Sequence, residues 1–122
     1  MLRQFVLLSF FLILASNLGA QGVVVIQVQR VMPAAALSGM VTFGAGGQGM
    51  PDVTVEDCTS GWKRVMRSVQ TNEHGLFSFP HAKRGGVHYL RVSHRGANTL
   101  LVKVRVGAGA HAELVLNLEP ST

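Results

Sequence analysis

Apolar residues occupy every second position over several short stretches of the chain. The clearest stretches are residues 99–106 and 111–118, where Leu, Val or Ala alternates with other side chains. Successive side chains of a β-strand point to opposite faces, so a period of two predicts strands with one buried face. The same reasoning predicts strands at 37–43, 53–58, 62–70, 76–79 and 87–94. Seven short strands separated by Gly-rich turns, with no helical period between them, predict an all-β chain folded as a seven-stranded β-sandwich.

Residues 71–80 combine a turn with a short aromatic strand. Asn72 and Gly75 tolerate the left-handed dihedrals of tight turns. Phe77 and Phe79 lie two residues apart, so both rings share one face and need an apolar layer opposite them. Applied to every strand, the alternation predicts this core: Val41, Val53, Val55, Val65, Phe77, Phe79, Leu90, Val92, Val102, Val104, Leu114 and Leu116.

Four segments occur in an order and spacing typical of one family. They are Ser-Gly-Met-Val-Thr at 38–42, Gly-Met-Pro-Asp-Val-Thr-Val at 49–55, Thr-Asn-Glu-His-Gly-Leu-Phe-Ser-Phe at 71–79 and Gly-Val-His-Tyr-Leu-Arg-Val at 86–92. Together they resemble the carboxypeptidase regulatory-like domain family. The resemblance implies a transthyretin-like Greek-key strand order for residues 37–119, and a non-catalytic, accessory role. The chain departs from the family at His88, where Tyr is usual, and at Ala97, where an aromatic is usual.

The first twenty residues have the layout of a secretory signal peptide. Arg3 precedes an apolar run over 5–14, and small residues follow up to Ala20. Cleavage between Ala20 and Gln21 would give a secreted, periplasmic or cell-envelope protein. The alternative is an uncleaved membrane anchor, because apolar residues resume at 23–26; only then do we expect a membrane as partner. Residues 21–36 form a lead-in segment and a candidate extra edge strand.

The charge and cysteine content narrow the setting of the domain. Cys58 is the one cysteine, so no internal disulfide forms, and an exported domain without one suggests a bacterial envelope. The formal net charge is +5, and the basic residues are scattered along the sequence, as expected for a solvated face. Arg67 shares a predicted face with Val65, which places strand 62–70 near a sheet edge where Arg67 can reach water. Predicted export and the lack of interleaved aromatics argue against a nucleic-acid partner.

No set of residues predicts catalysis. Gly44, Gly46 and Gly49 match a dinucleotide-binding spacing, but Pro51 and a β-branched strand follow where that motif needs a helix. Glu56 and Asp57 are neighbours on opposite faces of one strand, so they do not act as an acid–base pair. The histidines show no metal-ligand spacing. We therefore expect no enzyme activity, no cofactor and no metal.

Two functional hypotheses remain from the sequence. The first is an accessory module that contacts another envelope or extracellular protein, as the resemblance implies. The second is a carbohydrate-binding module, because related sandwiches bind glycans through exposed aromatic side chains. Trp62 and Tyr89 are the candidate ligand contacts, and the competing interpretation of Trp62 is a packing residue at a sheet edge.

Overall fold

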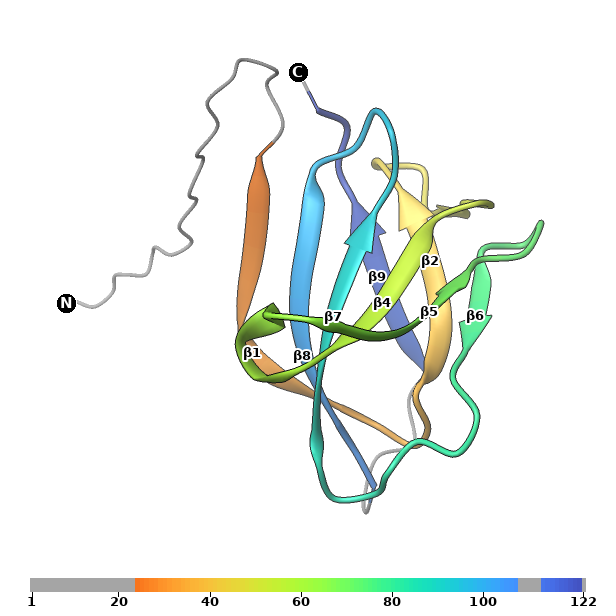
Figure 1. The fold of residues 1–122 in the computed structure, drawn as a ribbon. Coiled ribbons are helices and arrows are strands. Elements are labelled where there is room, and N and C mark those ends of the chain that lie inside the picture. Colours follow the sequence, from red (N-terminus) through yellow and green to blue (C-terminus); the bar gives the residue numbers. More distant parts are fainter. Residues whose placement is uncertain (1–23, 108–112, 122) are drawn as a thin grey trace, which may run out of the picture.

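The computed structural model describes residues 24–107 and 113–121, so the predicted signal peptide and its cleavage site lie outside the described residues. The described chain is all-β and forms two open mixed sheets, an arrangement consistent with a β-sandwich (Figure 1). The five-stranded sheet has the order β1-β8-β7-β4-β5, with bounds Val25–Ala34, Thr99–Val106, Val87–Ser93, Thr54–Cys58 and Val65–Gln70. The four-stranded sheet has β2 (Ser38–Phe43) paired with β3 (Gln48–Gly49), β6 (Leu76–Ser78) and β9 (Leu114–Leu118).

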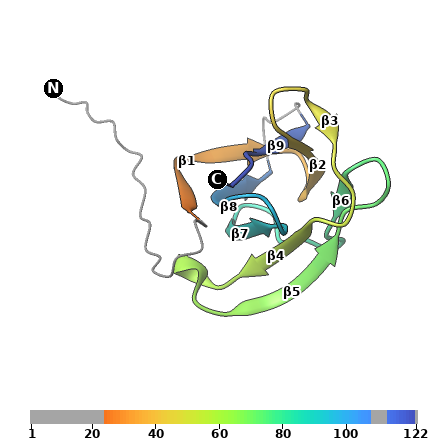
Figure 2. The same cartoon turned by 90° about the horizontal axis from the view of Figure 1, so that it is seen from above.

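The lead-in segment forms the extra edge strand that its alternation predicts. β1 pairs in parallel with β8 at the edge of the five-stranded sheet and continues through Pro33 to Ala34. Its register shifts between Gln27 and Val31, and Figure 2 shows β1 bending there toward the other sheet. The short strand β3 lies where the sequence predicts only a loop. The described residues therefore hold nine strands instead of the predicted seven.

One apolar core lies between the two sheets. Figure 2 shows β4 and β5 on one side and β2, β3 and β9 on the other. Apart from Val65, every residue predicted for the core is at most 4% exposed. The rings of Phe77 and Phe79 meet edge to face, with centroids 6.3 Å apart. Alternation alone therefore identified the buried face of most strands.

Val65 was assigned to the core incorrectly, since 44% of the residue is exposed. Asp57 pairs with Arg67, but Cys58 pairs with Val65, so Met66 is an extra residue on β5. An extra residue of this kind is a β-bulge, and it turns the side chains on one side of it to the opposite face. Alternation counted through the bulge therefore places Val65 on the wrong face.

The turn before β6 forms as its residue types predict. The Asn72 side-chain oxygen accepts hydrogen bonds from the backbone N–H groups of His74 and Leu76, at 2.8 and 3.0 Å. Gly75 has φ +81°, and a Cβ there would lie 2.6 Å from the Met50 nitrogen and 2.7 Å from the Val41 oxygen. Only glycine fits this approach, which joins the turn to the β2–β3 hairpin.

Candidate functional site

A turn between β4 and β5 places Trp62 over the five-stranded sheet. Residues Ser60–Trp62 form a short 3-10 helix, so β5 begins three residues later than the predicted strand 62–70. Gly61 and Trp62 have φ values of 76° and 58°, in the left-handed region. The turn is closed by the Thr59 hydroxyl, which accepts the Arg64 N–H at 3.0 Å. Trp62 therefore belongs to a folded-back turn, not to the strand.

The two candidate ligand residues predicted from the sequence lie in contact. The rings of Trp62 and Tyr89 meet edge to face at 85°, with centroids 5.1 Å apart. The Trp62 indole N–H donates to the Leu90 carbonyl oxygen at 3.0 Å. Both side chains are half-buried. Trp62 thus packs across β7, the middle strand of the sheet, while the pair still presents aromatic surface to solvent.

Basic side chains surround this aromatic pair on the outer face of the sheet. Arg91 donates to Glu56 at 3.1 Å and to the Trp62 carbonyl oxygen at 2.7 Å, which holds its guanidinium against the turn that contains Trp62. Tyr89 pairs with Lys103 across β7 and β8. Arg105 lies two residues beyond Lys103 and therefore on the same face.

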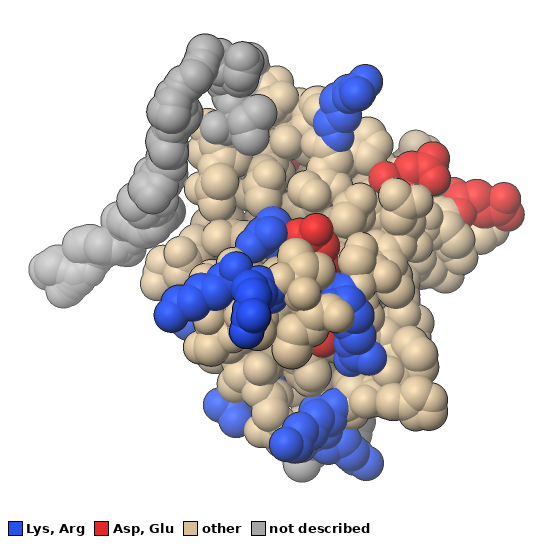
Figure 3. All heavy atoms as spheres, in the orientation of Figure 1, with Lys and Arg blue, Asp and Glu red and all other residues tan. Residues whose placement is uncertain are grey.

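The basic residues belong almost entirely to one of the two sheets. Of the eleven Lys and Arg, the ten that follow Arg3 lie on strands of the five-stranded sheet or in loops leading into them. No strand of the four-stranded sheet has a charged residue. Figure 3 shows Lys and Arg atoms mainly in the middle and at the lower end of one face, with a few more near its top; acidic atoms lie at the right edge and beside the central group. A charge that is scattered in sequence is therefore concentrated in space.

A cluster of polar residues lies on the inner face of the five-stranded sheet. Asp57 is 1% exposed, and its Oδ2 accepts from the Arg67 Nε at 3.1 Å. The His88 Nδ1 lies 3.3 Å from the same oxygen, and its Nε2 lies 3.2 Å from the Lys83 carbonyl oxygen. The Arg67 guanidinium also donates to the Pro80 carbonyl at 2.9 Å and lies 5.0 Å from the centre of the Phe79 ring. These contacts give the buried carboxylate two partners, so the cluster joins β4, β5 and β7.

Cys58 lies next to this cluster but is not an activated nucleophile. Its side chain is buried, and desolvation raises the pKa of the thiol above its usual value of 9.0. The positive charge of Arg91 opposes that rise without cancelling it. A thiol with a raised pKa is protonated at neutral pH, whereas a catalytic cysteine needs a lowered one. Cys58 therefore lacks the lowered pKa that a catalytic thiol needs.

The outer face of the four-stranded sheet is apolar instead of basic. Leu76 on β6 and Val115 on β9 each pair with Met40 on β2, so the three residues form a row across the sheet. Leu76 is 40% exposed and Val115 is 48% exposed. We call these three residues the apolar row. Single exposed apolar residues are ordinary on protein surfaces, whereas these three are neighbours on strands that have no charged residue.

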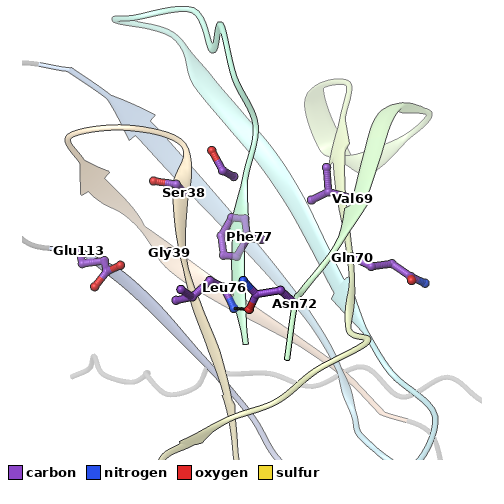
Figure 4. Close-up of a pocket in the computed structure, with 9 residues that line it drawn as sticks. Ser38, Gly39, Val69, Gln70, Asn72, Leu76, Phe77 and Glu113 are labelled. Atoms are coloured by element: carbon purple, nitrogen blue, oxygen red, sulfur yellow. Dashed lines mark hydrogen bonds between the residues drawn. The ribbon is translucent and has the colours of Figure 1, made fainter. Parts of the chain in front are cut away.

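A cleft borders one end of the apolar row. It has a volume of about 540 Å³ and lies where β5 and β6 separate at the open edge between the sheets. Figure 4 shows Leu76 and Phe77 on one wall and Val69 and Gln70 on the other. Glu113 is the one ionisable residue that lines the cleft among the described residues. The cleft therefore extends the weakly charged surface of the apolar row.

Sequence reasoning missed the cluster of Asp57, Arg67 and His88, although its signal is present. Asp57 follows Val53 and Val55 at the inward positions of β4, and His88 precedes Leu90 and Val92 at those of β7. Polar residues at inward positions of neighbouring strands are candidates to meet. The predicted separation of Glu56 from Asp57 is confirmed, because Glu56 pairs with Arg91 on the outer face.

Comparisons with known proteins give no family for the chain. A scan against protein-family models finds no match, and a search of curated proteins finds no similar sequence. Within residues 24–107 and 113–121, no three His, Cys, Asp or Glu residues lie close enough to hold a metal ion. Over the same ranges, no helix is long and apolar enough to cross a bilayer.

Proposed function

We propose that the chain is an exported, non-catalytic accessory module that acts by contacting another envelope or extracellular protein. In this proposal it is a carboxypeptidase regulatory-like domain with the transthyretin-like Greek-key strand order. The all-β fold supports the proposal, as does the resemblance to that family of the segments at 38–42, 49–55, 71–79 and 86–92.

The apolar row is the observation that carries this proposal. A partner that covers the exposed Leu76 and Val115 lowers the free energy by roughly 25 cal/mol per Å² of apolar surface removed from water. The strands beneath them have no charge that a partner would have to desolvate. Glu113 and Glu119 flank β9, so the partner surface that fits best is apolar with a basic rim.

A matched pair of variants tests the proposed contact. Val115→Lys puts a charge at the β9 end of the apolar row, and Met66→Lys puts the same charge on β5, where Met66 is 61% exposed. Residues 21–122 would be immobilised and exposed to the envelope fraction of the source cells. We expect a specific protein to be retained by the unchanged chain and by Met66→Lys, and to bind Val115→Lys more than about tenfold more weakly. Equal retention by both variants would overturn the proposed surface. Hydrolysis of a small substrate by the chain alone would overturn the non-catalytic role.

The carbohydrate-binding module is the second candidate function. The contact between Trp62 and Tyr89 favours it, because the structure brings both candidate ligand residues to one place on the outer face. A glycan pull-down with Trp62→Phe and Trp62→Ala tests it. Phe keeps an aromatic face and loses only the N–H donated to Leu90, so weaker retention of Ala than of Phe supports sugar stacking. Equal retention of the two variants would remove this candidate.

A further inference from the structure

We infer that the outer face of the five-stranded sheet binds an acidic polysaccharide. The surface extends from Trp62 and Tyr89 through Arg91 to Lys103 and Arg105, and we call it the basic face. The inference rests on the carbohydrate-binding candidate and names its ligand class. It does not depend on the apolar row, which lies on the other sheet.

The charge distribution is the first argument. Among the described residues, ion pairs engage only Arg67 and Arg91 of the ten basic residues on the five-stranded sheet or in the loops leading into it. Its acids are only three, and two of them, Glu56 and Asp57, are those partners. Basic side chains without an acidic partner raise the local concentration of an anionic polymer and speed its association. The opposite sheet has no such field, so the attraction is confined to one side of the molecule.

The spacing of the cations is the second argument. Lys103 and Arg105 lie on the same side of β8, two residues apart, which is about 7 Å along a strand. Arg91 lies on the neighbouring strand, two residues beyond the Tyr89 that pairs with Lys103. The result is a row of positive charges along rigid strands. A linear acidic polysaccharide presents its carboxylates at regular intervals, and each can meet one of these cations.

The aromatic pair is the third argument, and it distinguishes a sugar from other anions. The bond from the indole N–H to Leu90 fixes the Trp62 ring against β7, and Tyr89 packs against it. Arg91 on β7 donates to Glu56 and to the Trp62 carbonyl oxygen, so the turn that positions Trp62 is tied to the sheet a second time. A pyranose ring can pack on an aromatic side chain while its carboxylate pairs with Lys103, which lies across from Tyr89.

Two other anionic partners fit these observations less well. A lipid surface is usually met by apolar side chains that enter the interface, but the Trp62 indole is tied to β7. Single-stranded nucleic acid needs a series of stacking side chains, and this face offers one edge-to-face pair. Anionic vesicles and single-stranded DNA therefore serve as competing probes in the test.

The test measures binding of the chain from Gln21 onward to immobilised polygalacturonate at about 150 mM salt, where surface charges act over roughly 8 Å. Lys103→Glu reverses a charge beside Tyr89, and Arg95→Glu makes the same change in the turn between β7 and β8. We expect roughly tenfold weaker binding for Lys103→Glu and less than about twofold for Arg95→Glu. Arg105→Glu, at an exposed position, repeats the test if Lys103→Glu does not fold by circular dichroism.

The possible outcomes separate this inference from the function on which it rests. Equal losses for the Lys103 and Arg95 variants would show an effect of net charge alone and overturn the inference. Equal binding to neutral dextran would overturn the acidic ligand class while leaving a carbohydrate-binding module in place. No binding to either polysaccharide would overturn both. Tighter binding to phosphatidylglycerol vesicles or to single-stranded DNA than to polygalacturonate would also overturn it.

Discussion

Removing the guanidinium of Arg67 should destabilise the protein far more than removing another surface arginine. In Arg67→Met the side chain keeps an apolar stem over Phe79 but loses the donors to Asp57 and Pro80. Asp57 is 1% exposed, so water cannot replace the lost donor, and the carboxylate is left with His88 alone. Breaking a buried ion pair by removing one partner costs about 3–5 kcal/mol.

The expected loss lies at or just below the lower end of that range. The Arg67 side chain is 36% exposed, so solvent already screens part of its attraction to Asp57. We therefore expect a loss of about 2–3 kcal/mol, or a fall in Tm of roughly 10–20 °C for a domain of about 100 residues. Urea and thermal unfolding followed by circular dichroism measure both values. The control is Arg105→Met on β8, which removes one 3.3 Å hydrogen bond to Gly85 and should cost less than about 0.5 kcal/mol.

A double variant tests the cause of the loss. Asp57→Asn removes the buried negative charge, so adding it to Arg67→Met should recover part of the stability. The two changes should differ from additivity by about 1–3 kcal/mol, as expected for residues in direct contact. Additive losses, or an Arg67→Met variant as stable as Arg105→Met, would refute the interpretation of the cluster as a buried ion pair that holds three strands together.

Three further predictions concern single positions in the fold. Gly75→Ala should lower the free energy of unfolding in urea by about 2–4 kcal/mol, because φ is positive and a Cβ would meet backbone atoms. The control is Gly46→Ala, where nothing lies within 4 Å of a Cβ, and it should change stability by less than about 0.5 kcal/mol. Thr71→Val should cost about 1–3 kcal/mol, since its hydroxyl donates to Met50 and accepts from Val53, while Thr71→Ser should retain most of the stability; equal losses would contradict this role. Burial raises the pKa of Cys58, so above pH about 9 the unfolded state releases a thiol proton that the folded state still holds. The free energy of unfolding should therefore be unaffected by this group below the unfolded pKa and should fall as pH rises from about 9 through the folded pKa, and Cys58→Ala should lack this fall.

The sequence predicted the fold well where a simple period of two holds along a whole strand. In β8 and β9 every second residue is buried, and alternation alone identifies Val102, Val104, Leu114 and Leu116. The prediction failed at Val65 because a bulge depends on how β5 pairs with β4, and one strand's sequence does not show its partner. Pairing also determines that β1 joins β8 in parallel.

The candidate site was predicted only in part for the same reason. Composition identified Trp62 and Tyr89 as the available aromatics, but their contact depends on the left-handed backbone at Gly61 and Trp62. Basic residues distant in sequence, such as Arg91 and Lys103, become neighbours only when β7 pairs with β8. Charge clustering across strands is a property of register, and register follows from the complete set of strand pairs.

The division of the surface between a basic face and an uncharged sheet is the central claim, and NMR tests it most directly. Polygalacturonate would be titrated into the isotopically labelled chain from Gln21 onward while the backbone amide shifts are recorded. We expect the shifts to change at residues 62–64, 89–91 and 101–105 and to stay constant in β2, β6 and β9. Changes centred on β2, β6 and β9, or changes spread evenly over the whole surface, would contradict the claim.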